Sequence, residues 1–108
     1  MDIYPTTIEI ARLIVTADTP LTDATVVEVA QVGYRGVPES STTWVPATWV
    51  GEPGLRRICE VLVTGRQVTT APANALRLGT RGRRQAFIRL PQTTEQIIRP
   101  TLGVFQVH

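Results

Sequence analysis

The chain of 108 residues has no lysine, one cysteine and one histidine. A single Cys59 excludes an internal disulfide and a thiolate zinc cluster within one chain. His108 alone cannot supply a serine triad, a Cys-His pair or a two-histidine metal site. The carboxylates are scattered along the sequence, and acid-base chemistry at neutral pH usually recruits histidine or tuned carboxylates. We therefore predict no catalytic residues, no metal site and no cofactor. The protein is predicted not to be an enzyme, and the alternative of a small hydrolase is disfavoured.

The excess of positive over negative charge is also small: the chain has 11 arginines and nine acidic residues, which gives a net charge of +2. Such a chain has no strong field for a polyanion unless its charges cluster. The one cluster is Arg77, Arg81, Arg83 and Arg84, which we interpret as a basic hairpin. It is open to three interpretations: a solvated loop, a contact with a protein, or a contact with nucleic acid. Phe87 is the nearby aromatic residue that could stack on bases, which weakens the last interpretation.

Long apolar runs are missing, because no segment approaches the roughly 20 residues that span a bilayer. Residues 1–5 lack the basic and apolar regions of a signal peptide. We therefore expect a soluble chain, without a membrane partner, in a reducing compartment.

Aromatic residues make up only 6% of the chain, whereas valine and threonine are abundant. Both are β-branched and favour strands. With 43% hydrophobic and 19% charged residues, the composition predicts one folded domain over residues 1–108. Residues 1–6 are expected to form an extended N-terminal arm.

Alternating apolar residues and turn signals place the strands. We predict them at residues 7–16, 25–32, 42–50, 55–64, 83–90 and 102–107. The first is expected to carry a bulge near residues 13–15, where the alternation changes phase. Helical spacing also fits residues 7–16 and 25–32, but their β-branched content favours strands.

Proline and the central strand set further expectations. Pro46 cannot donate to a sheet, so residues 42–50 should form an edge strand or a strand broken in two. Residues 55–64 are apolar on both sides and should be central. Residues 91–100 should form a loop with one helical turn at 94–97.

About seven short strands with turns between them predict an all-β fold, a small immunoglobulin-like β-sandwich. Trp44 is expected to fill the core between the sheets, and Trp49 to be an exposed contact anchor. Cys59 should be a small buried hydrophobe. Glu60, if buried, needs an arginine partner.

Several elements from Trp44 onward resemble small structural proteins of tailed actinobacterial phages, encoded among the head and head-to-tail genes. The matching elements are Trp-x-x-Ala-x-Trp (Trp44, Ala47, Trp49), a strand ending at Gly65, the Ala75 to Gly79 element, residues 86–90, a Glu95 loop with Arg99-Pro100, and residues 102–107. Two departures stand out: residues 81–84 form a basic insert, and the first third of the chain shows no family motif.

The resemblance implies an immunoglobulin-like virion component, present in many copies and acting by contact. We expect a structural protein of a tailed bacteriophage, assembled in the host cytoplasm, in the head-to-tail connector (neck) or on the capsid shell as a decoration. Its partners would be capsid, portal or connector subunits and further copies of itself, joined by strand addition at exposed edges and termini. The candidate contact residues are Tyr4, Trp49, Arg81, Arg83, Arg84 and Phe105. The alternative is a nucleic-acid-binding module that uses the arginine-rich segment 77–84.

Overall fold

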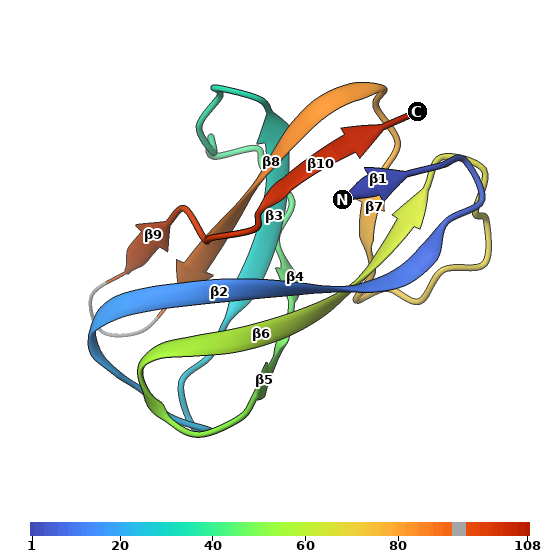
Figure 1. Cartoon of the computed structure of the whole chain (residues 1–108). Coiled ribbons are helices and arrows are strands. Elements are labelled where there is room, and N and C mark those ends of the chain that lie inside the picture. The colour runs from blue at the N-terminus through green and yellow to red at the C-terminus, as the bar shows by residue number, and fades with distance from the viewer. Residues whose placement is uncertain (92–94) are drawn as a thin grey trace.

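Two facing sheets make up the molecule (Figure 1). The computed structural model describes residues 1–91 and 95–108, and these form ten strands. Their bounds are β1 Asp2–Ile3, β2 Ile8–Leu21, β3 Glu28–Gly33, β4 Val45–Pro46, β5 Thr48–Val50, β6 Gly54–Gly65, β7 Leu76–Leu78, β8 Gly82–Leu90, β9 Gln96–Ile98 and β10 Val104–Val107. The prediction of an all-β fold is confirmed, and the helical alternatives for residues 7–16 and 25–32 are wrong.

Sheet A contains β1, β10, β8, β3 and β4 in that order, and β9 pairs with β8 beyond the end of β10. Sheet B has the order β2-β6-β5, and β7 pairs with β6 beyond β5. Long β6 is therefore central in sheet B, as predicted. The two sheets pack together as a small β-sandwich. In the described residues we find no helix long and apolar enough to cross a membrane.

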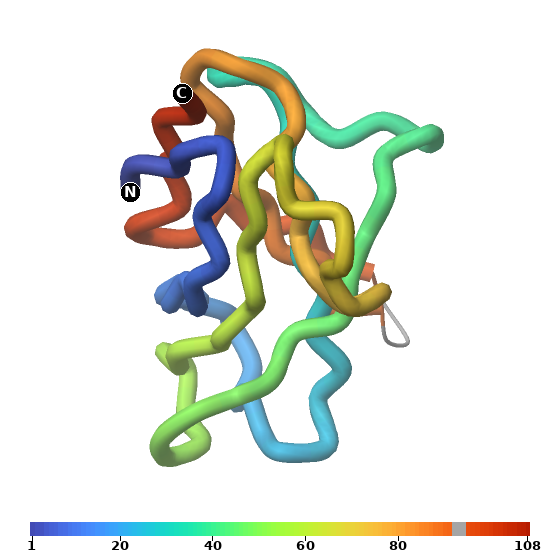
Figure 2. The backbone as a smooth tube through the Cα atoms, turned by 90° about the vertical axis from the view of Figure 1, so that its right-hand side faces the viewer, coloured from blue at the N-terminus to red at the C-terminus, as the bar shows by residue number. Residues whose placement is uncertain are grey.

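The chain changes sheets in the middle of the predicted strand 42–50. β4 pairs with β3 in sheet A, and β5, which begins two residues after β4 ends, pairs with β6 in sheet B. Pro46 ends the first piece because it has no N–H for the ladder. Figure 2 shows this green segment running from one layer to the other. The interpretation of a strand broken in two is confirmed.

The core lies between the inward faces of the two sheets. Leu13 and Val63 from sheet B pack against Ile88 and Phe105 from sheet A, and all four are fully buried. Trp44 is not in this core, contrary to prediction. It is half-buried on the outside of sheet A, where the Arg89 guanidinium carbon lies 4.6 Å from its ring centroid.

The two termini lie side by side (Figure 1). β1 pairs in parallel with β10, and Ile3 is fully buried, so residues 1–6 are docked on the domain rather than an extended arm. The ring of His108 stacks on Tyr4 with centroids 4.7 Å apart, and its Nε2 lies 3.0 Å from Asp2 Oδ1. The terminal histidine is thus held in place.

Three local predictions fail for identifiable reasons. Residues 13–15 of β2 stay in regular register with β6, and the irregularity lies between Thr16 and Leu21. The change of phase at 13–15 reflects apolar side chains on both faces of the strand. Residues 96–98 form strand β9 instead of the predicted helical turn, whose residue Thr94 lies outside the described residues. Residues 77–84 do not form a hairpin, because β7 belongs to sheet B and β8 to sheet A.

Candidate contact surface on sheet B

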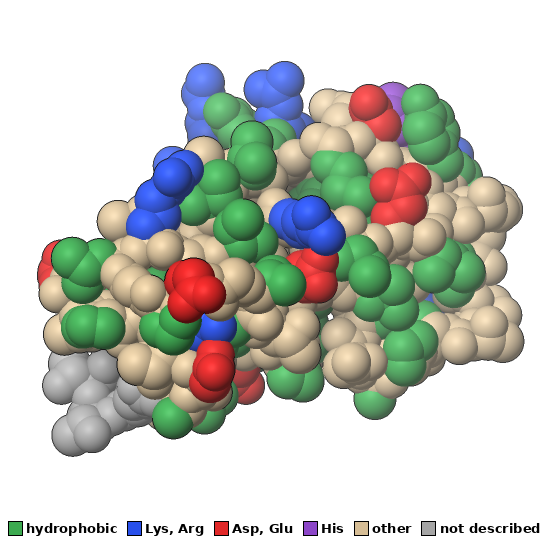
Figure 3. Space-filling model, turned by 60° about the horizontal axis from the view of Figure 1, so that its bottom comes forward, with side chains coloured by type: hydrophobic (Ala, Val, Ile, Leu, Met, Phe, Trp, Pro, Cys, Tyr) green, Lys and Arg blue, Asp and Glu red, His purple; other side chains and the backbone are tan. Residues whose placement is uncertain are grey.

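The outward side of sheet B is apolar, although it is not covered by the other sheet. We call it the outer face of sheet B and define it by seven even-numbered residues, those at positions 8–14 of β2 and 58–62 of β6: Ile8, Ile10, Arg12, Ile14, Ile58, Glu60 and Leu62. Strand pairing sets Ile10 beside Leu62 and Ile14 beside Ile58. Figure 3 shows a face of the molecule on which several groups of hydrophobic side chains surround a few charged ones. An antiparallel sheet that faced only water would carry polar residues here.

Exposure at the start of β2 is high for residues of this type. The side of β2 that faces the core buries Ala11 and Leu13, whereas Ile8 is 60% and Ile10 is 59% exposed. Exposed apolar residues that are grouped on one face commonly mark an interaction site. The face is therefore the strongest candidate for a contact surface.

One ion pair interrupts the apolar rows. Arg12 and Glu60 lie opposite each other on β2 and β6, and Arg12 Nε donates to Glu60 Oε2 at 2.7 Å. The arginine partner predicted for Glu60 is thus present. Because the side chain of Arg12 is mostly exposed, we assign this pair a stabilising effect of at most about 1 kcal/mol. Its main effect is that neither charge stands unpaired in the apolar face.

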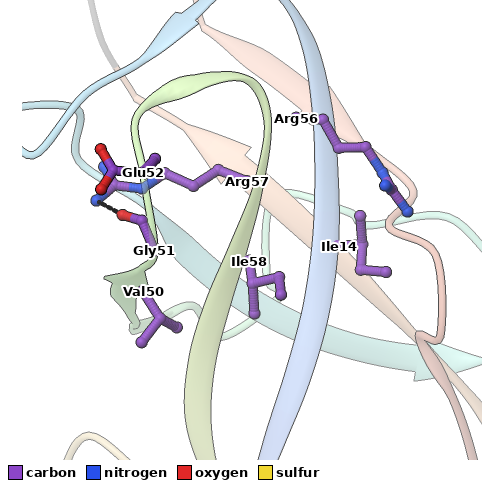
Figure 4. Close-up of a pocket in the computed structure, with 7 residues that line it drawn as sticks. All are labelled: Ile14, Val50, Gly51, Glu52, Arg56, Arg57 and Ile58. Atoms are coloured by element: carbon purple, nitrogen blue, oxygen red, sulfur yellow. Dashed lines mark hydrogen bonds between the residues drawn. The ribbon is translucent and has the colours of Figure 1, made fainter.

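The face is hollowed beside the β5–β6 turn. Val50, Ile58 and Ile14 lie in a row across β5, β6 and β2, and line a depression of about 380 Å³ (Figure 4). A second depression, of about 290 Å³, lies around Ile10 and Leu62. Both are open and shallow, which suits a protein surface better than an enclosed small molecule.

Buried Arg57 supports this end of the face from below. Its side chain is only 4% exposed and reaches from β6 to the turn before it (Figure 4). Its Nη2 donates to Asp23 Oδ1 at 2.5 Å and to the Gly51 carbonyl at 2.8 Å, and its Nη1 donates to the Leu21 carbonyl at 3.4 Å. Trp49 lies under the guanidinium, 5.5 Å from ring centroid to Arg57 Cζ. One arginine thereby ties the β2–β3 connection to the β5–β6 turn.

One of the residues predicted to make contacts is not available for them: Phe105 is fully buried in the core, because its position in β10 faces sheet B. Trp49 is partly rather than fully exposed. It packs against the core, and its Nε1 donates to the Thr25 carbonyl at 2.7 Å. Tyr4 is exposed, but at the far end of the molecule from Trp49, beside His108.

The predicted arginine cluster is dispersed over both sheets. Arg77 donates to the Val68 and Arg66 carbonyls, and Arg84 Nε donates to Gln31 Oε1 at 2.5 Å. Arg83 lies over the Tyr34 ring, 4.9 Å from its centroid. Arg81 is exposed, and no partner for it is seen among residues 1–91 and 95–108. Most of these guanidinium groups are therefore already engaged with the chain itself.

Cys59 is the free cysteine of the core. Burial raises the pKa of the Cys59 thiol to about 12, so it is neutral at physiological pH, as expected for a small buried hydrophobe. Within the described ranges, no three side chains of the types His, Cys, Asp and Glu come together in a way that could hold a metal ion.

The outer face of sheet B was missed at the level of sequence, although it left a signal there. The change of phase in the apolar alternation of residues 7–16 predicts a bulge, but its cause is that this strand is apolar on both sides. Comparison with family models, with curated proteins and with solved structures finds no match to this chain.

Proposed function

We propose that this chain is a structural subunit that acts through protein contacts, and that its setting is the particle of a tailed bacteriophage, in the neck or on the shell. It would be assembled in the host cytoplasm and act in several copies beside capsid, portal or connector subunits. The proposal assigns it no catalytic residue and no cofactor.

The observation that carries the proposal is the contrast between the two outer faces. On sheet A, Phe87 is buried under Arg99, whose Cζ lies 5.4 Å from its ring centroid, and Arg89 pairs with Glu28. Exposed apolar residues remain on sheet A as well, namely Ile97 at 49% on β9 and Val104 at 37% on β10, but they lie on two separate short strands. On sheet B, Ile8 and Ile10 remain more than half exposed. An uncovered apolar face on one side of a sandwich favours a partner there.

The phage setting is supported by the resemblance of the sequence from Trp44 onward. The elements that carry it fall at junctions of this fold: the Trp-x-x-Ala-x-Trp element spans the change of sheets, and Gly65 ends β6. Such positions are determined by architecture, which suits a protein whose family features are structural.

A direct test is quantitative mass analysis of purified particles of the phage that encodes the chain. We expect the chain in every particle, at a copy number that fits a ring in the neck or a lattice on the shell. Its absence from particles would refute the virion setting while leaving a contact function intact.

The nucleic-acid alternative makes a separate prediction. Binding to duplex DNA through Arg81 and its neighbours would weaken steeply as salt rises. We expect no binding to duplex DNA at about 50 mM salt, in the range where non-specific binders still hold. Binding that weakens with salt and is lost in Arg81→Ala would favour the alternative.

A further inference from the structure

β2 is the strand at one edge of sheet B. The direction of its backbone groups follows from two sets of hydrogen bonds. Gly65 N–H donates to the Thr7 carbonyl, in the same register as the β2–β6 ladder. In an antiparallel ladder such pairs recur at every second residue, so the odd residues of β2 face β6. On the opposite side, Ile14 exchanges two backbone bonds with Thr101. The even residues of β2 therefore face away from β6.

Three even residues precede Ile14 in β2: Ile8, Ile10 and Arg12. Each directs one N–H and one C=O away from β6, and none of these six groups has a partner among the described residues. Their side chains lie on the outer face of sheet B and are exposed. We call residues 8–12 the open edge of β2.

The open edge carries few of the devices that usually protect a free strand. Natural edge strands carry charged side chains, proline or a bulge that discourage pairing. Residues 8–12 contain no proline and keep regular register with β6; their two charged residues are Arg12, which is already paired with Glu60, and exposed Glu9. The edge is therefore suited to receive another strand.

We propose that the open edge of β2 pairs with the open edge of a second copy of this chain, antiparallel about a two-fold axis at Ile10. Ile10 then lies opposite Ile10 of the second copy, and Ile8 lies opposite Arg12 of the second copy. By symmetry Arg12 lies opposite Ile8 of the second copy, which makes three residue pairs in all. Each pair is of the hydrogen-bonded type, so each of the six unpartnered N–H and C=O groups gains a hydrogen bond. The two B sheets become one continuous sheet, and their apolar outer faces become one surface.

Other antiparallel registers are less favourable. An axis at Glu9 sets Glu9 against Glu9, and an axis at Arg12 sets Arg12 against Arg12; like charges directly opposite each other are destabilising. Axes at Ala11 or Arg12 also bring the second copy alongside Ile14, where Thr101 already pairs. With the axis at Ile10, the residue opposite Ile14 is Thr6, which lies in the turn between β1 and β2, where the second chain leaves the sheet.

This inference rests on the proposed contact function and adds a partner to it. It needs only residues 8–12 and does not depend on the phage setting. A chain that enters particles but never pairs through β2 would refute this inference alone. A chain that pairs through β2 but is absent from particles would refute the virion setting alone.

Disulfide trapping tests the register. Two residues in a hydrogen-bonded antiparallel pair have Cα atoms about 5.5 Å apart, within the range of a disulfide. Ile10→Cys should therefore form a covalent dimer on mild oxidation, while the native Cys59 stays buried and unreactive. Ile8→Cys alone should not, because its two copies would be about 13 Å apart along the strands. A mixture of Ile8→Cys and Arg12→Cys should form a mixed dimer.

Sedimentation equilibrium of the full chain tests the association itself. The wild type should form a dimer as concentration rises, and Ile10→Lys should raise its dissociation constant more than about tenfold, because two lysines would stand opposite each other. Leu55→Lys is the matched control, since Leu55 is 54% exposed on β6 and lies outside the open edge; it should dimerise like the wild type. A wild type that is monomeric up to its solubility limit would overturn the inference. So would an Ile10→Lys variant, folded by circular dichroism, that dimerises normally.

Discussion

Gly65 tests quantitatively how closely the turn between β1 and β2 packs against the end of β6. A Cβ at this position would lie 2.0 Å from the Tyr4 carbonyl oxygen and 2.7 Å from the Pro5 carbonyl oxygen. These atoms belong to the turn that connects β1 in sheet A to β2 in sheet B, and backbone atoms cannot rotate away as a side chain can. Gly65→Ala therefore requires the turn to move by more than 1 Å, on the order of the gap to an ordinary contact of roughly 3.5–4 Å.

That movement strains or breaks two backbone bonds, from Gly65 N–H to the Thr7 carbonyl and from Gln67 N–H to the Pro5 carbonyl. Overpacking costs about 1–3 kcal/mol, and each lost bond about 0.5–1.5 kcal/mol. We expect Gly65→Ala to lower the free energy of unfolding by about 2–4 kcal/mol. In a domain of this size that is a fall in Tm of roughly 10–20 °C.

Urea unfolding followed by tryptophan fluorescence measures the difference. Gly54→Ala is the control, because its added Cβ would lie 3.9 Å from the nearest atom, the Arg56 carbonyl oxygen. We expect the control to change stability by less than about 0.5 kcal/mol or to raise it slightly. If Gly65→Ala were as mild as Gly54→Ala, the close approach of the β1–β2 turn to β6 would be wrong.

Three further predictions concern the core and the buried groups. In urea unfolding, Arg57→Met should lower the free energy of unfolding by about 2–4 kcal/mol, because it leaves the Gly51 carbonyl without its donor. Asp23→Asn should lower it by less than about 1 kcal/mol, because the Asp23 side chain is 85% exposed. Equal losses in the two variants would contradict the assignment of Arg57 as a buried link between the two loops. Phe105→Ala should cost about 3–5 kcal/mol and strongly lower Tm, and a negligible effect would remove Phe105 from the core. The pKa of the Cys59 thiol is raised to about 12 in the folded state, so the neutral thiol favours the folded state below pH 9.0, and this contribution is lost as the pH rises from there toward 12. A Cys59→Ala variant should lack that part of the pH dependence of stability. Identical stability–pH profiles for the wild type and the variant would argue against burial of Cys59.

Much of the sandwich follows from local patterns. Alternation in residues 83–90 and the two-sided apolar pattern of residues 55–64 were sufficient to place β8 and β6, because the periodicity of a buried strand is visible in its own residues. Pro46 marked the change of sheets for a local reason, its missing N–H. By contrast, β1, β7 and β9 are only two or three residues long, and β1 pairs with β10 at the other end of the chain. No pattern within such a short segment can reveal it.

The contact residues could not be placed from sequence because a strand residue turns to the core or to solvent according to its register. The prediction that Phe105 is exposed is wrong, because its parity in β10 directs it inward. Trp44 is predicted to lie in the core and lies outside it, whereas Trp49 is predicted to be exposed and packs against the core. The reason is that the chain changes sheets between them. Ile8 and Ile10 look like core residues by composition and lie outside. Deciding this required knowledge of which side of β2 faces sheet A.

Amide hydrogen exchange of Ile8, Ile10 and Arg12 tests the central claim most directly, namely that the chain works through a free edge and the apolar face beside it. In the dilute monomer these three amides should exchange rapidly, while those of Ala11 and Leu13, which face β6, should be protected. In the assembled state, all five should be protected. Rapid exchange of Ile8, Ile10 and Arg12 in the assembly, or full protection of them in the dilute monomer, would contradict the account.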